Sequence, residues 1–122
     1  MDLSNLKPTT SELAIKDPAT DQPTGLVIEL RYVNDDKYEQ HSYERVMAEA
    51  EGGEAPSYSQ YKRRRIDQIA GACVGWRWEG DASFGGEKLE FGTENLRKVL
   101  AVNEIRDQVE KRLNDKKRFF PG

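Results

Sequence analysis

Side chains that commonly do acid–base, nucleophilic or metal chemistry are few in this chain. The 122 residues include one histidine, His41, and one cysteine, Cys73. Zinc needs about four Cys or His ligands, and a cysteine nucleophile needs a base beside it. His41 stands in a highly charged stretch, as a solvated surface histidine does, whereas Cys73 belongs to an apolar stripe and is predicted to be a small buried hydrophobe. We therefore expect a protein without catalytic residues, metal or cofactor.

A basic run, KRRR at residues 62–65, suggests a nucleic-acid partner. Four consecutive cations can meet phosphates, and Tyr58 and Tyr61 can stack on bases. The alternative is that the run forms the solvated face of a helix. Acidic residues on both sides and a net charge of -3 favour this alternative. A small nucleic-acid-binding module that uses Lys62–Arg65 therefore ranks second among the functional hypotheses.

Both tryptophans of the chain lie in ACVGWRWEG, residues 72–80. If the preceding helix ends at Gly75, the two indoles share one face of an extended segment, but if it continues they lie about 200° apart. In either geometry we predict that Trp76 covers the core. Trp78 is followed by polar residues, so it is predicted to be half exposed and to contact a partner protein.

A second aromatic pair, Phe119 and Phe120, lies near the end of the sequence. Terminal residues are poorly ordered unless they are tied down, so both rings are predicted to serve an oligomer or partner contact. The alternative is that one ring folds back onto Val109 and Leu113 while the other stays in water. The predicted protein-interaction residues are thus Trp78, Phe119 and Phe120.

A β-hairpin is predicted near the start of the chain. Residues 1–11 are expected to form a flexible arm that precedes one domain over residues 12–122. Alternating apolar residues predict a hairpin over residues 12–33, with turn formers at 17–25. Its second strand is expected to turn one set of side chains to the same side: Leu26, Ile28, Leu30 and Tyr32.

About four helices are predicted to follow, over residues 35–120, which makes the fold class α+β. The second of them carries the apolar stripe Ile66, Ile69, Ala70, Cys73 and Val74. Thr93 and Asn103 are expected to be the N-caps of the last two helices. The predicted segments are a helix at 35–51, a linker at 52–59, a helix at 60–74, a glycine-rich loop at 79–92, a short helix, and a last helix that runs into the cations at 116–118.

The composition indicates a small soluble protein. With 36% hydrophobic and 34% charged residues, the chain can bury a modest core. A single cysteine fits a reducing compartment. The sequence contains no apolar run of about 20 residues, and we expect no signal peptide. We expect a cytoplasmic location and no membrane partner.

Several segments, taken in order, resemble the tail assembly chaperones of long-tailed bacteriophages and prophages. The resemblance extends over nearly the whole chain. The segments are MDLSNLKP at the start, DPATDQPTGLVIEL, the helical middle, ACVGW, a glycine-containing loop leading to LEFGTENLRKVL, and IRDQVEKRLNDKKRFF near the end.

The resemblance implies a non-enzymatic scaffold that works in the cytoplasm of the bacterial host and is absent from the mature virion. Such a protein binds the tape measure protein, keeps it soluble and recruits tail tube subunits to it. The resemblance also implies a homo-oligomer.

Overall fold

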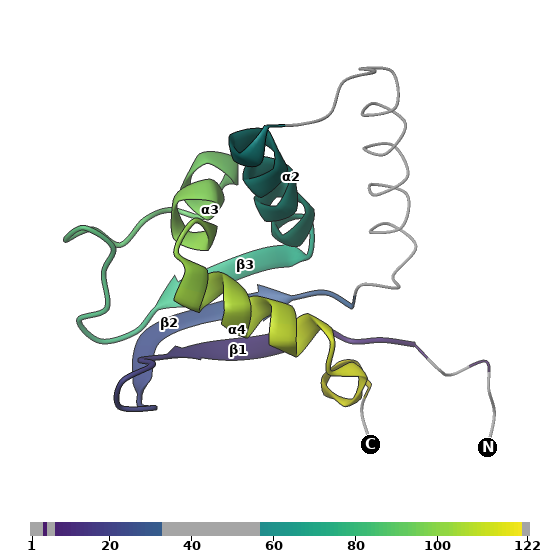
Figure 1. The fold of residues 1–122 in the computed structure, drawn as a ribbon. Coiled ribbons are helices and arrows are strands. Elements are labelled where there is room, and N and C mark those ends of the chain that lie inside the picture. Colours follow the sequence, from purple (N-terminus) through teal and green to yellow (C-terminus); the bar gives the residue numbers. More distant parts are fainter. Residues whose placement is uncertain (1–3, 5–6, 33–56, 121–122) are drawn as a thin grey trace.

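A three-stranded antiparallel sheet and three α-helices are the main elements of the part of the chain that the computed structural model describes, which is residue 4, residues 7–32 and residues 57–120. The strand order is β1-β2-β3. Figure 1 shows the helices gathered on one side of the sheet. The predicted α+β class is confirmed. The elements are β1 (Ser11–Lys16), β2 (Pro23–Leu30), α2 (Tyr58–Ala70), β3 (Cys73–Trp78), α3 (Thr93–Leu100), α4 (Asn103–Leu113) and the 3-10 helix η2 (Lys116–Phe119).

The predicted hairpin is confirmed. β1 pairs with β2 in an antiparallel register that places Leu13 opposite Ile28. Buried and exposed residues alternate along β1, because successive side chains of a strand point to opposite faces. The turn is held by Asp17, whose Oδ1 accepts a hydrogen bond from the backbone N–H of Ala19 at 2.8 Å.

The segment from residue 58 to residue 78 corrects the prediction of a helix over 60–74. The helix α2 begins after Ser57, whose side chain and that of Gln60 form a capping box, and it ends at Ala70. Cys73 then starts the third strand, in which Trp76 lies opposite Ile28 of β2. Pairing with β2 gives hydrogen-bond partners to the backbone N–H and C=O groups of a segment rich in aromatic residues. This stabilisation by a distant part of the chain outweighs the helical spacing of the local apolar residues.

Three of the predicted helices lie within the described residues, and the predicted helix at 35–51 lies outside them. The expected N-caps are each wrong by one residue. Gly92 caps α3 and Val102 caps α4, and neither provides a side-chain hydrogen bond. A short break at Asn114 and Asp115 separates α4 from η2, so residues 116–118 do not belong to the last α-helix.

The end of the described chain corrects the expectation of an exposed phenylalanine pair. Phe119 is fully buried, at 0% exposure, and its ring centroid lies 5.5 Å from that of Tyr32. Phe120 is half-buried and meets Tyr32 edge to face at 5.2 Å. The backbone N–H of Thr9 donates to the carbonyl oxygen of Phe119 at 2.6 Å. These contacts supply the cover that a terminal aromatic pair usually lacks.

One hydrophobic core joins the inner face of the sheet to the helices. Its largest fully buried side chains are Phe119, Ile28, Leu30, Leu100, Val99 and Val109. Within the described ranges, no helix has both the length and the apolar character needed to cross a bilayer.

Candidate protein-binding site

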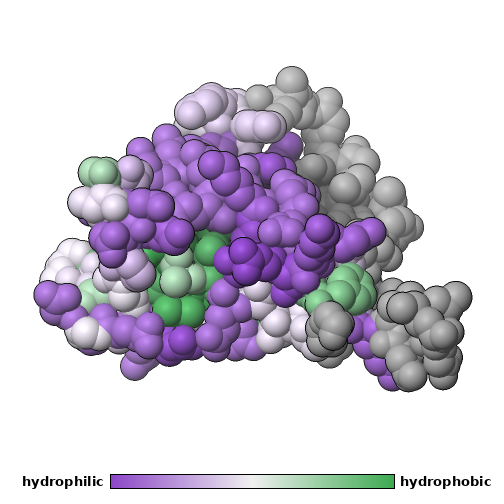
Figure 2. All heavy atoms as spheres, turned by 90° about the horizontal axis from the view of Figure 1, so that it is seen from below, coloured by the Kyte–Doolittle hydropathy of each residue, from purple (hydrophilic) through white to green (hydrophobic). Residues whose placement is uncertain are grey.

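A mostly hydrophobic pocket of about 410 Å³ opens where the β1–β2 turn, the glycine-rich loop and the start of α4 meet. Seen from below, the surface carries a compact hydrophobic patch enclosed by hydrophilic residues (Figure 2). Charged and polar side chains also line the pocket, among them Lys16, Asp17 and Glu104. The hydrophobic lining consists of Ile15, Pro18, Leu26, Trp78, Ala82, Phe84, Val102 and Ile105.

Gly25 brings the loop close to the sheet at this pocket. Its φ of +103° lies in the region that favours glycine, and a side chain here would collide with the carbonyl oxygen of Glu79 and with Ala82. The backbone N–H of Glu79 donates to the carbonyl oxygen of Gly25 at 2.7 Å. Because no side chain stands between them, the loop packs directly on β2 and forms one wall of the pocket.

The two tryptophans hold the far end of the same loop. Both indole Nε1 atoms donate to a single acceptor, the carbonyl oxygen of Leu89, each at 2.9 Å. Their rings meet edge to face at 5.7 Å, and Trp76 makes a similar contact with Phe91 at 5.3 Å. Trp76 and Trp78 are both half-buried, so the pair connects the core to the loop that contains Leu89. Of the two, only Trp78 lines the pocket.

The opposite wall is fixed by contacts between α4 and the edge strand β1. The side-chain amide of Gln108 accepts from the backbone N–H of Lys16 at 2.8 Å and donates to its carbonyl oxygen at 2.9 Å, as a neighbouring strand would. Arg112 Nη1 donates to the carbonyl oxygen of Glu12 at 2.8 Å. These side chains occupy the outer backbone groups of β1 and hold α4 in place.

Of the three predicted interaction residues, only Trp78 lines this pocket. Phe119 is inside the core, so its predicted exposure is wrong, and Phe120 packs on Tyr32 away from the pocket lining. The sequence offered no signal that joins Val102 and Ile105 to the turn at residues 17–22, because these segments meet only in the folded chain.

The cations of the basic run do not all face the same surface. Arg65 donates to Glu110 of α4 at 3.1 Å. Lys62 and Arg63 instead line a groove between α2 and α3. Successive residues of a helix point about 100° apart, and that rotation distributes the cations around α2.

The described residues offer little reactive chemistry. The Cys73 thiol is buried, and loss of hydration raises its pKa to about 12. Among these residues, no cluster of three or more His, Cys, Asp or Glu side chains could hold a metal ion, and His41 lies outside them. Comparisons of the chain with protein-family models, with curated proteins and with solved structures found no match.

Proposed function

We propose that this chain is a non-enzymatic tail assembly chaperone of a long-tailed bacteriophage or prophage. In this proposal it binds the tape measure protein, keeps it soluble and recruits tail tube subunits, in the cytoplasm of the bacterial host. It self-associates and does not remain in the mature virion. The resemblance of the segments quoted above supports the proposal, and the hydrophobic pocket beside Trp78 is the structural observation on which it depends.

The pocket suits the capture of an apolar side chain from an extended or helical client. Its volume of about 410 Å³ lies within the range of about 300–1,000 Å³ that binding pockets commonly have. A desolvated pocket with an aromatic wall and a polar rim is the environment in which interface residues contribute most to affinity. A chaperone that keeps a long client soluble needs such a contact, because it must cover apolar residues that would otherwise aggregate.

Val102→Asp separates binding from folding. Val102 lines the pocket and is also the N-cap of α4, with extended backbone angles and no side-chain hydrogen bond to the helix. Aspartate is among the best N-cap residues, so the variant keeps α4 while it places a carboxylate in the pocket wall. Thr93→Asp is the matched control, because Thr93 is exposed at the start of α3 and is not among the pocket-lining residues.

The experiment co-expresses each variant with the tape measure protein encoded in the same genome and measures the soluble fraction of that protein after centrifugation. We expect the wild type and Thr93→Asp to keep it soluble and Val102→Asp to lose most of this effect, with unchanged circular dichroism. A tape measure protein that stays equally insoluble with and without the wild-type chain would refute the proposed function. Equal activity of Val102→Asp and the wild type would show that the pocket is not the binding site.

A further inference from the structure

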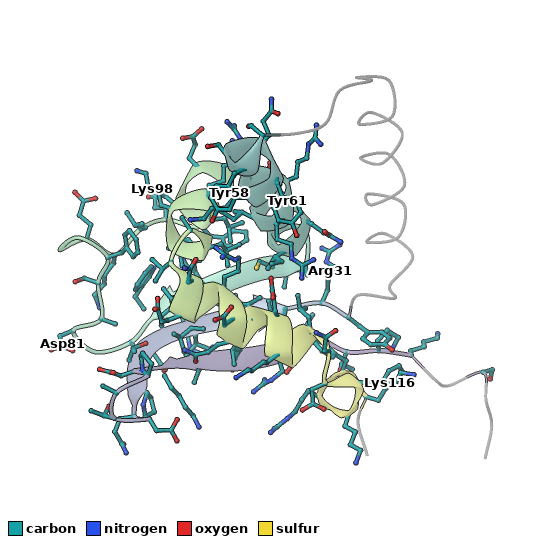
Figure 3. The ribbon with its side chains drawn as sticks, in the orientation of Figure 1. Arg31, Tyr58, Tyr61, Asp81, Lys98 and Lys116 are labelled. Carbon is teal, nitrogen blue, oxygen red and sulfur yellow. The ribbon has the colours of Figure 1, made fainter. Side chains whose placement is uncertain are left out.

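A second surface, the groove between α2 and α3, differs from the hydrophobic pocket in its chemistry. It has a volume of about 690 Å³ and is open to solvent. Figure 3 labels Tyr58 and Tyr61 on α2, and Lys116 on η2, apart from them. The lining residues are Tyr58, Ser59, Lys62, Arg63 and Ile66 from α2, and Glu94, Arg97 and Ala101 from the α3 side.

The lining of this groove has more positive than negative side chains. Lys62 and Arg63 form no ion pair within the part of the chain that the structure describes. Arg97 is already paired, since its guanidinium binds Asp67 of α2 at 2.9 and 3.3 Å and thereby joins the two helices. Glu94 is the single carboxylate in the lining. Within the described residues, the groove therefore offers two cations, Lys62 and Arg63, that have no ion-pair partner.

The α2 side of the groove has a regular helical repeat. Its α2 residues recur on one face over positions 58–66, about 12 Å of helix axis at 1.5 Å per residue. Tyr58 is 78% exposed at one end, and the buried Ile66 provides an apolar floor at the other. An amphipathic helix laid in such a groove can place an apolar residue between the helices and carboxylates against the cations.

We propose that the groove between α2 and α3 binds an acidic amphipathic helix of a partner protein, with Lys62 and Arg63 pairing with its carboxylates and Tyr58 packing on its apolar side. The inference does not depend on the proposed function, because it concerns a different surface. A nucleic acid fits less well, since only Lys62 and Arg63 of the basic run line the groove, and Arg65 is held by Glu110 outside it.

The test uses a fluorescein-labelled peptide that repeats glutamate and leucine at helical i, i+4 spacing, with a glutamine-for-glutamate peptide and a single-stranded DNA oligonucleotide as further probes. Fluorescence anisotropy gives the affinity of the full chain for each. We expect the acidic peptide to bind and the glutamine peptide to bind at least roughly tenfold more weakly, because charge complementarity decides the choice of partner. Backbone amide shifts in NMR spectra should change around residues 58–66 and 94–101.

Lys62→Glu, Arg63→Glu reverses the two groove charges, and Lys116→Glu, Lys117→Glu makes the same charge change on η2, away from the groove. The first pair should abolish peptide binding, and the second should leave it within about twofold, as rim or distant charges do. Tyr58→Ser, at an exposed position, should weaken binding without unfolding.

Three results would overturn the proposal. The acidic peptide does not bind, the two charge-reversal pairs weaken it equally, or the oligonucleotide binds more tightly and displaces it. The last result would restore the nucleic-acid hypothesis for Lys62 and Arg63.

Discussion

The thiol of Cys73 lies 3.6 Å from the carbonyl oxygen of Ile69, inside the core rather than at a surface. Removal from water disfavours the thiolate and raises the pKa of this group from 9.0 to about 12. Since the thiolate is the reactive form, Cys73 is inert at neutral pH, which agrees with its predicted structural role. At the scale of single residues, burial has made a potential nucleophile into a packing group.

The same burial makes stability depend on pH in the alkaline range. Below about pH 9 the thiol is protonated in the folded and the unfolded chain, so its ionisation does not change the free energy of unfolding there. Between about pH 9 and pH 12 only the unfolded chain ionises, and folding loses about 1.4 kcal/mol per pH unit from this group. Urea unfolding should therefore show a steeper alkaline loss of stability in the wild type than in Cys73→Val. Parallel pH profiles of the two proteins would show that the thiol is not desolvated.

Helix capping gives a prediction at the scale of the element. Gly92 is the N-cap of α3, yet it has no side chain to bind the free N–H groups of the first turn. Its φ of 174° is extended backbone that any residue adopts, and a Cβ atom there meets nothing within 4 Å. Gly92→Ser should therefore raise the free energy of unfolding by roughly 0.5–1 kcal/mol, through a new cap and a less flexible unfolded chain.

The control for this exchange is Gly92→Ala, which restricts the unfolded chain in the same way but cannot cap. The free energy of unfolding, measured by heat or urea, should be about 1 kcal/mol higher for Gly92→Ser than for Gly92→Ala. If the two variants are equally stable, α3 gains nothing from a side-chain cap at this position.

Elements with a clear period could be predicted from the sequence. Alternation along β1 and β2 predicted the hairpin, and the last predicted helix coincides with α4 over most of its length. The secondary structure of residues 60–78 is harder to predict. Ile66 and Ile69 belong to a buried helical face, but the next apolar residues belong to a strand. Its pairing partner, β2, lies more than forty residues earlier in the chain, and local spacing carries no information about such a partner.

The candidate site was less predictable than the elements. Trp78 was recognised from its polar neighbours, but the pocket takes its other walls from β1, β2, the loop at residues 79–92 and the start of α4. Taken alone, each of these segments has the residue pattern of an ordinary core element or turn. The pocket depends on contacts between segments that are distant in the sequence, namely the close packing that Gly25 permits and the paired hydrogen bonds of Gln108. Only the folded chain brings the lining residues together.

At the scale of the whole molecule, the two ends of the described chain are tied to each other. Thr9 bonds the backbone of Phe119, and the Phe119 ring enters the core beside Tyr32. A residue 110 positions away from Thr9 thus helps to hold the backbone just before β1. Exchanging Phe119 therefore affects folding first, and self-association is better tested at the half-buried Phe120.

Phe119→Ala should lower the free energy of unfolding by about 3–5 kcal/mol, because it removes a fully buried ring and leaves a cavity. That loss is a large share of the 5–15 kcal/mol typical of a whole domain. Phe120→Ala should cost clearly less, since its ring is half-buried. Urea unfolding measures both, and light scattering on Phe120→Ala reports the oligomeric state of a chain that is still folded. Equal losses of stability for the two variants would mean that the Phe119 ring is no more important to the core than the Phe120 ring. A smaller assembly in Phe120→Ala than in the wild type would place Phe120 in a contact between copies of the chain.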